Sequence, residues 1–235
     1  MVFLDKGRVD VIVNPYARGV PEPRRIKAAC DALLREGWEV HPWYTETKGD
    51  STRLARAAHD ARSKVVIACG GDGTLNEVVQ SLAGSSTALS VIPAGTANVW
   101  ANESGFPRDP VKAALAIQTS EVVPADLGVA NGRYFLLMGS IGFDALVAAT
   151  VNPTLKKRVG AIAYAVQAAA EVRKLKRLKV ELRMDGRLTE LEAMMVVIGN
   201  TRLYGGVLEI TRNAFADDGF LDVCALDAEG LVDAL

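Results

Sequence analysis

The sequence contains few cysteines, almost no net charge and no long apolar run. The three cysteines, Cys30, Cys69 and Cys224, are scattered, and none stands in a CxxC pair of the kind that binds metals. We therefore expect reduced thiols in a cytoplasmic protein. The formal net charge is -1, which gives no indication of nucleic-acid binding. No apolar run is long enough to span a bilayer, and the N-terminal residues contain no signal-peptide core.

Two common nucleotide-binding motifs are also missing from the central stretch 64–83, which reads KVVIACGGDGTLNEVVQSLA. It contains neither the GxxxxGK[ST] loop nor the GxGxxG pattern, which disfavours an ordinary P-loop NTPase or dinucleotide dehydrogenase. The apolar run 65–69 instead predicts a buried strand, and the apolar spacing over 75–82 predicts a helix. Thr74 and Glu77 have capping-box spacing, so we expect Thr74 to cap this helix.

The glycine turn 70–73 between this strand and this helix is the candidate functional element. Glycine lets the backbone approach a ligand closely, and the free N–H groups at a helix N-terminus attract phosphate. Asp72 within the turn would repel a phosphate unless a metal ion or a transferred proton balances the charge. The turn therefore predicts a phosphate site that works with a cation, and a plain strand-to-helix turn stays open as the alternative.

The first half of the chain alternates between strand and helix patterns. Thr96 is expected to cap the helix that follows the fourth strand, and Asp109 with Pro110 is expected to open another helix. Such alternation is typical of an α/β fold. The expected strands are 8–13, 38–44, 65–69 and 88–92, and the expected helices include 23–36, 51–61 and 74–83.

The pattern changes near residue 127, where hairpin-type turns at Asn131-Gly132 and Asp185-Gly186 replace the alternation. We therefore predict an α/β nucleotide-binding domain over 1–126 and a mainly antiparallel β domain over 127–235. Its strand-like segments are 134–140, 178–184, 188–198 and 220–226. A helix with basic ends is predicted over 159–178, and those ends suit either anionic lipid headgroups or a solvated helix terminus.

The motifs at 70–77, GGDGTLNE, and 93–98, PAGTAN, resemble those of the diacylglycerol kinase and sphingosine kinase superfamily, especially its soluble bacterial lipid kinases. The resemblance implies ATP-dependent transfer of the γ-phosphate to the hydroxyl of diacylglycerol, a sphingoid base or a related lipid. It implies that Asp72 is catalytic, binding Mg²⁺ directly or through water, or taking the hydroxyl proton. The nucleotide-binding residues that it implies are Asn14, Thr45, Gly70, Gly71, Asp72, Gly73, Thr74, Leu75, Asn76 and Thr96.

The segment 214–222, AFADDGFLD, resembles the metal loop of bacterial members of the same superfamily. The resemblance implies that Asp218 and the backbone carbonyls of Phe215 and Phe220 hold Mg²⁺, a hard cation that prefers oxygen ligands. The alternative is a turn in which the aspartate caps its own backbone. The implied partner is a lipid at a membrane surface, which a cytoplasmic enzyme approaches from the water, and a homodimer stays open.

The chain departs from the superfamily at two positions. Val99 stands where the Gly-Thr-x-Asn motif is usually followed by Asp, and no residue matches the late Glu that serves as general base. We therefore expect a second domain that is truncated at its C-terminus and lacks its closing strands, with nucleotide binding but weak or no phosphoryl transfer. Two alternatives stay open, an NAD kinase, which shares the GGDGT element, and a non-catalytic module that binds a nucleotide or a lipid.

Overall fold

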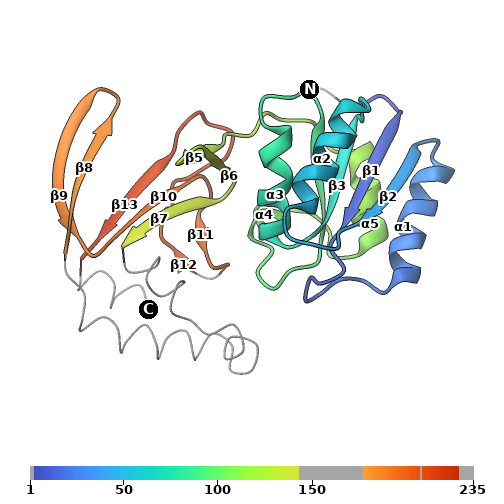
Figure 1. Ribbon diagram of the computed structural model, residues 1–235, viewed down its shortest axis with the longest axis horizontal. Coiled ribbons are helices and arrows are strands. Elements are labelled where there is room, and N and C mark those ends of the chain that lie inside the picture. Colours follow the sequence, from blue (N-terminus) through green and yellow to red (C-terminus); the bar gives the residue numbers. More distant parts are fainter. Residues whose placement is uncertain (1–2, 143–176, 207, 228–235) are drawn as a thin grey trace.

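The computed structural model describes residues 3–142, 177–206 and 208–227. Within these ranges the chain forms an α/β part, which contains a parallel sheet, and a second part made of antiparallel strands (Figure 1). The predicted fold class is confirmed in both respects. The helix predicted over 159–178, with its basic ends, lies almost wholly outside the described residues.

The α/β part is built on a four-stranded parallel sheet with the strand order β2-β1-β3-β4. Its strands are β1 (Arg8–Val13), β2 (Glu39–Tyr44), β3 (Val65–Gly70) and β4 (Ala88–Pro93). Its helices are α1 (Pro23–Arg35), α2 (Asp50–Asp60), α3 (Asp72–Leu82), α4 (Val99–Glu103), α5 (Pro110–Leu115) and the short 3-10 helix η1 (Ala116–Gln118). These bounds agree with the expected strands and helices to within one or two residues. As expected, Asp109 caps α5 by accepting the backbone N–H groups of Val111 and Lys112.

Two apolar layers cover the parallel sheet, one on each face. The side chains of Val65 and Ile67 pack in the cluster that contains α1 and α5, whereas Val66 packs in the cluster that contains α2 and α3. Alternate residues of a strand point to opposite faces, so a strand covered by helices on both faces needs apolar residues at every position. All six residues of β3 are buried, and this accounts for the continuous apolar run in the sequence.

The second part consists of short antiparallel ladders. Its largest sheet has the order β13-β10-β7, and the remaining strands form pairs. The segments predicted over 134–140 and 188–198 each contain two strands rather than one. The strands are β5 (Gly128–Ala130), β6 (Arg133–Phe135), β7 (Met138–Gly142), β8 (Leu178–Met184), β9 (Arg187–Ala193), β10 (Met195–Gly199), β11 (Leu203–Tyr204), β12 (Leu208–Glu209) and β13 (Asp222–Leu226).

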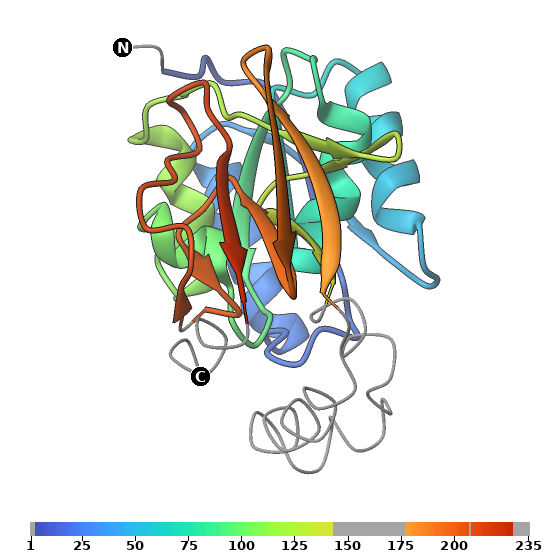
Figure 2. The same cartoon turned by 90° about the vertical axis from the view of Figure 1, so that its left-hand side faces the viewer.

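The two predicted hairpin turns are present, and each has the backbone that its sequence suggests. Asn131 and Gly132 have φ of 50° and 77°, and Asp185 and Gly186 have φ of 48° and 82°. Two consecutive residues with positive φ are the mark of the type I′ turn that matches the twist of a hairpin. The second turn joins β8 to β9. This hairpin lies at the end of the molecule opposite the parallel sheet in Figure 1 and faces the viewer in Figure 2.

Candidate functional site

A cavity of about 320 Å³ lies at the carboxyl ends of β1, β3 and β4. In a parallel α/β sheet this edge is where ligands bind, because the loops that follow the strands meet there. The cavity is lined by loop residues and the first turns of α3: Asn14, Ala17, Arg18, Gly71, Gly73, Thr74, Glu77, Gly95 and Thr96. The loop after β1 and the two loops that carry the glycine motifs therefore form one site.

The two glycine loops pack against each other backbone to backbone. A Cβ atom added to Gly95 would lie 2.6 Å from the Cα atom of Gly71, and one added to Gly71 would lie 2.9 Å from the Cα atom of Gly95. Real Cβ atoms do not come so close to other atoms, so both positions require glycine. The loop after β3 and the loop after β4 are thereby held as one surface of bare backbone.

Thr74 does not cap α3, contrary to the expected capping box. The N-cap residue is Gly71, and Thr74 lies inside the first turn, where it is buried. Its Oγ1 accepts a hydrogen bond of 3.1 Å from Nδ2 of Asn14. Thr74 therefore connects the loop after β1 to the start of α3. The first N–H groups of a helix have no partners within the helix, so this end of α3 can donate to an anion in the cavity.

Asp72 binds the start of α4 rather than projecting freely into the cavity. Its Oδ2 accepts from the backbone N–H of Val99 at 3.1 Å, and its Oδ1 accepts from that of Trp100 at 3.2 Å. The expectation that Thr96 caps this helix is wrong, because the N-cap residue is Asn98, in the left-handed conformation, and no side-chain cap is formed there. A carboxylate at a helix N-terminus is favourable because it faces the positive end of the helix dipole.

The structure brings five of the predicted nucleotide-binding residues to the lining of the cavity. They are Asn14, Gly71, Gly73, Thr74 and Thr96. Gly70 and Asp72 are their neighbours in the chain but do not line the cavity. Leu75 is a core residue with 1% of its surface exposed. Asn76 faces the second part, where its Oδ1 accepts from the N–H of Leu136. Thr45, buried at the end of β2, is bonded through its N–H to Val13 and also lies outside the lining.

Four residues of the lining were not identified as site residues from the sequence: Ala17, Arg18, Glu77 and Gly95. Arg18 follows Asn14 in the same loop, and Glu77 lies one turn after Gly73 on α3. Gly95 belongs to the second glycine motif but was not assigned to the site. The signal for Glu77 was obscured because its spacing from Thr74 also fits a capping box. The guanidinium of Arg18 and the carboxylate of Glu77 place one charge of each sign in the lining.

The predicted metal loop lies in the second part, where it is largely exposed. Oδ1 of Asp218 accepts the N–H of Phe220 at 2.9 Å, which is the local turn that was considered as the alternative. Asp126 anchors the loop, since its Oδ2 accepts from the N–H of Gly219 at 2.7 Å. Among the described residues no cluster of three or more metal-ligating side chains occurs. One carboxylate with backbone carbonyls at a wet surface fits a hydrated Mg²⁺, which keeps several of its waters.

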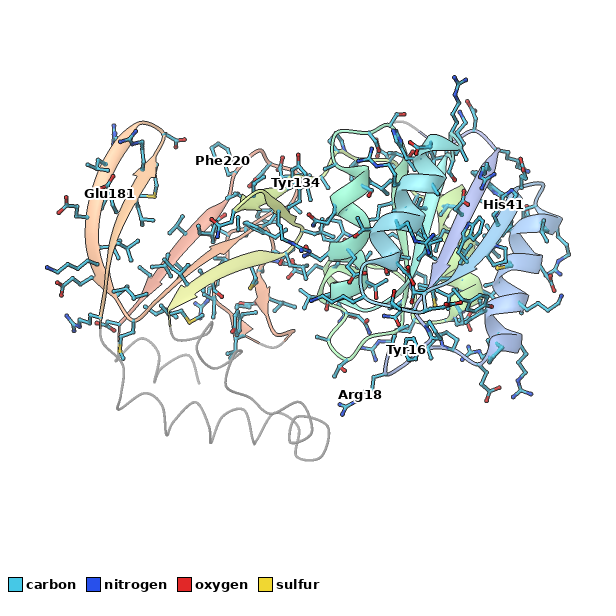
Figure 3. The ribbon with its side chains drawn as sticks, in the orientation of Figure 1. Tyr16, Arg18, His41, Tyr134, Glu181 and Phe220 are labelled. Carbon is cyan, nitrogen blue, oxygen red and sulfur yellow. The ribbon has the colours of Figure 1, made fainter. Side chains whose placement is uncertain are left out.

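The cavity and the metal loop are well separated. Figure 3 shows Arg18 at the lower edge of the α/β part and Phe220 near the upper edge of the second part. The structure therefore does not bring Phe215, Asp218 and Phe220 together with the phosphate cavity. A larger groove, of about 970 Å³, lies between the edge of β4 and the second part. Of the predicted site residues only Phe215 lines it, and most of its lining is apolar.

None of the three cysteines has the environment of a nucleophile. Burial raises the pKa of the Cys69 thiol, which directly precedes the glycine turn, to about 12. Burial also raises the pKa of Cys30 and that of Cys224. The thiolate is the reactive form of cysteine, so these residues are protonated at neutral pH and act as small apolar side chains.

The chain belongs to the diacylglycerol kinase catalytic domain family, because residues 8–130 match the family of that description. Residues 138–234 match a second family, described as the YegS C-terminal NAD kinase beta sandwich-like domain. The class of protein that the fold and the glycine loops define is therefore that of the diacylglycerol-kinase-like phosphotransferases. This agrees with the resemblance inferred from the two glycine motifs.

Several named proteins are similar to this chain over most of its length. A "Probable lipid kinase YegS-like" protein of Pseudomonas putida is 35% identical over 86% of this chain and 69% of its own length. The "Diacylglycerol kinase" of Bacillus subtilis is 30% identical over 96% of this chain and 76% of its own. The crystal structure of a diacylglycerol kinase from Bacillus anthracis superposes with a TM-score of 0.76, at 29% identity, covering 96% of this chain and 75% of that one. In the described part of the chain, no helix is long and apolar enough to cross a membrane.

Proposed function

We propose that this protein is an ATP-dependent lipid kinase that transfers the γ-phosphate of ATP to a lipid hydroxyl. The observation that carries the proposal is the cavity at the strand ends, where Gly71 and Gly95 present bare backbone in front of the N-terminus of α3. Such a surface suits a polyphosphate, because N–H groups and the helix dipole both favour negative charge. Membership of the diacylglycerol kinase catalytic domain family supports the same reading.

The residues around the cavity have different roles in binding. The α3 N-terminus and the glycine backbone hold the phosphates, and Arg18 supplies a positive charge at the cavity. Glu77 adds a negative charge, so a polyphosphate here requires a cation to balance it. Mg²⁺ supplies that neutralisation when it is bound, and in phosphoryl transfer the protein acts chiefly by positioning the reactants and stabilising charge.

Asp72 in this proposal positions the site rather than taking a proton. Both of its oxygens already accept backbone N–H groups, those of Val99 and Trp100. A carboxylate that accepts two backbone N–H groups is held in place by these charge-assisted hydrogen bonds. Asp72 therefore keeps the two glycine loops and α4 in one arrangement, and it contributes negative charge close to the cation of the nucleotide.

An NAD kinase is the second candidate, because the second family match is described as NAD kinase beta sandwich-like. Relatives named lipid kinase or diacylglycerol kinase favour the lipid. A non-catalytic nucleotide- or lipid-binding module is the third. The three candidates predict different results in a single assay. A lipid kinase labels lipid, an NAD kinase labels NAD, and a binding module labels neither.

The test offers labelled ATP with Mg²⁺ to the protein together with a total lipid extract, NAD or a long-chain diol. The proposal predicts label in lipid and none in NAD. Asp72→Asn, which keeps one acceptor oxygen, is expected to lose about a hundredfold in turnover because α4 loses its register with the glycine loop. Glu22→Gln is the control, since Glu22 is exposed and its carboxylate pairs with Arg24. Label in NAD would overturn the proposal in favour of the second candidate. Tight ATP binding with no labelled product, the outcome expected from the missing late Glu, would overturn it in favour of the third.

A further inference from the structure

A carboxylate lies at each end of helix α4. One comes from the glycine turn, and the other belongs to the helix itself. At the start of the helix Asp72, from the glycine turn, accepts the N–H groups of Val99 and Trp100. At its end the helix supplies its own carboxylate, that of Glu103. The helix is only five residues long and is continued by a backbone hydrogen bond from Ser104 to Trp100. A short hydrogen-bonded helix held at both ends moves as a unit.

Glu103 reaches into the second part and binds its backbone. Its Oε1 accepts from the N–H of Leu203 at 2.8 Å, and its Oε2 accepts from the N–H of Arg202 at 3.2 Å. The Arg202 guanidinium lies 3.6 Å from the same carboxylate. Only 11% of the Glu103 side chain is exposed, whereas 42% of that of Arg202 is. The two backbone bonds fix where β11 begins relative to α4, and the shielded carboxylate makes them stronger than bonds at an open surface.

The contact continues from Arg202 to the candidate metal loop. The Cζ atom of Arg202 lies 6.0 Å from the centroid of the Phe215 ring and over its face, at the outer range of a cation–π contact. Phe215 is the first of the residues assigned to Mg²⁺, and Gly219 of the same loop is held by Asp126. A continuous set of contacts thus runs from the glycine turn through α4, Glu103 and Arg202 to the loop 215–220.

We propose that Glu103 is a positioning residue that holds the loop 215–220 in register with the phosphate cavity through α4. The inference rests on the proposed function and gives the loop 215–220, which the structure does not bring to the cavity, a part in that reaction through its position. The two loops are far apart (Figure 3), so their relative position depends on the elements that join the two parts. α4 contacts the glycine turn through Asp72 and reaches the loop 215–220 indirectly, through Glu103 and Arg202.

A second join between the two parts provides the contrast. Gln80 of α3 exchanges two hydrogen bonds with the backbone of Tyr134, one of 2.7 Å and one of 3.1 Å. Tyr134 lies between the two parts in Figure 3. This join stabilises the same assembly but has no contact in common with the loop 215–220. Loss of Gln80 therefore removes interface stability without removing the path that runs through Glu103.

The experiment compares Glu103→Ala, Glu103→Gln and Gln80→Ala with the unchanged chain. It measures kcat and KM for ATP, the Mg²⁺ concentration for half-maximal turnover, and hydrogen exchange of the backbone N–H groups. We expect Glu103→Ala to lower kcat by about tenfold to about a hundredfold and to raise the Mg²⁺ requirement, with little change in KM for ATP. Glu103→Gln, which keeps one acceptor oxygen, is expected to lie between Glu103→Ala and the unchanged chain. Exchange should rise at 202–203 and at 216–220 in Glu103→Ala alone.

Two results would overturn the inference. One is an equal rise in the Mg²⁺ requirement for Gln80→Ala, which would mean that general loosening of the interface is enough. The other is unchanged exchange at 216–220 in Glu103→Ala. Failure of the proposed function is seen separately, as absence of phosphoryl transfer to any lipid by the unchanged chain. In that event the exchange measurements still decide whether Glu103 positions the loop, because they need no turnover.

Discussion

The glycine turn 70–73 and the loop 215–220 each contain an aspartate directly before a glycine, but they are closed in different ways. Asp72 accepts hydrogen bonds from residues 27 and 28 positions later in the chain. Asp218 accepts one from Phe220, only two positions later. A turn closed by distant residues is fixed by the fold around it, whereas a turn closed by its own backbone depends on its neighbours for orientation. The first loop is therefore rigid because the fold around it fixes it, whereas the position of the second loop depends on its neighbours.

Burial follows the same division. The turn 70–73 continues directly from β3, whose residues are all buried between two helix layers. In the loop 215–220, by contrast, 55% of Phe215 and 66% of Phe220 are exposed. Large aromatic side chains at an open surface bury little apolar area and therefore add little to the stability of the loop. Substitutions at the packed positions of the first loop should consequently alter folding, whereas Gly73 is exposed and has room for a side chain. Substitutions in the second loop should alter ligand binding alone.

The largest effect is expected for Gly95→Ala. The new Cβ would lie 2.6 Å from the Cα atom of Gly71. The backbone of residue 95 fixes the Cβ, and the Cα is itself backbone, so neither atom can move without shifting a loop. We expect the variant to lose about 3 kcal/mol of stability and most of its affinity for ATP. Chemical denaturation measures the first quantity and calorimetric titration with ATP the second.

Gly73→Ala is the matched control for this prediction. Nothing lies within 4 Å of a Cβ atom at Gly73, although Gly73 lines the same cavity. Because alanine is favoured over glycine in a helix, the variant should fold at least as stably as the unchanged chain. A stable Gly95→Ala protein that binds ATP normally would show that the two glycine loops are not locked together, and the contrast between rigid and positioned loops would fail.

The elements of the α/β part could be predicted from the sequence because their signals are local. Apolar runs predicted β1, β3 and β4 to within a residue, and Asp109 before Pro110 predicted the cap of α5. The caps of α3 and α4 were predicted wrongly, since each involves residues that the fold alone brings together. Thr74 bonds to Asn14, which is 60 residues away. A capping pattern in the sequence cannot reveal that side chains distant in the chain form the hydrogen bonds at the start of a helix, as Asn14 does at α3 and Asp72 at α4.

The joins between the two parts were beyond prediction for the same reason. Asn200 is completely buried, and its Nδ2 donates to the carbonyls of Asp126 and Leu136. Glu103 and Arg202 meet only because α4 and β11 are adjacent in the fold. Nothing in the spacing of these residues along the chain distinguishes them from ordinary surface positions. The predicted domain boundary near residue 127 stays a prediction.

An intermediate effect is expected for Asp10, a buried carboxylate in β1. Burial favours the neutral acid, but hydrogen bonds from Arg8 and Trp43 outweigh it and hold the pKa of Asp10 below its ordinary value. A carboxylate whose pKa is lowered by folding stabilises the protein above its unfolded pKa of about 3.9, and this contribution is lost as the pH falls through the folded pKa. We expect Asp10→Asn to cost about 2 kcal/mol at neutral pH.

The measurement for Asp10 is urea denaturation at neutral pH and at about pH 3, where an ordinary carboxyl group is protonated. The stability difference between the unchanged chain and Asp10→Asn should shrink at the lower pH, because the variant has no carboxyl group to protonate. Asp50 and Asp109 also have lowered pKa values, held by backbone hydrogen bonds first and by arginine second, but they are present in both proteins. A difference that does not change with pH would contradict the assigned role of Asp10.

The smallest effect on stability, and the sharpest test of the comparison, is expected at Asp218. Two readings of this residue compete, a Mg²⁺ ligand and a turn that caps its own backbone through the N–H of Phe220.

Asp218→Ala removes both the charge and the acceptor, whereas Asp218→Asn keeps an acceptor oxygen and removes only the charge. Because the residue is exposed, we expect either change to cost about 0.5 kcal/mol or less. The two readings should therefore be separable by Mg²⁺ binding alone. If Asp218 holds the cation, both variants lose the response of turnover to low Mg²⁺. If it serves only the turn, Asp218→Asn behaves like the unchanged chain, and the loop 215–220 has no part in the reaction proposed for the glycine turn.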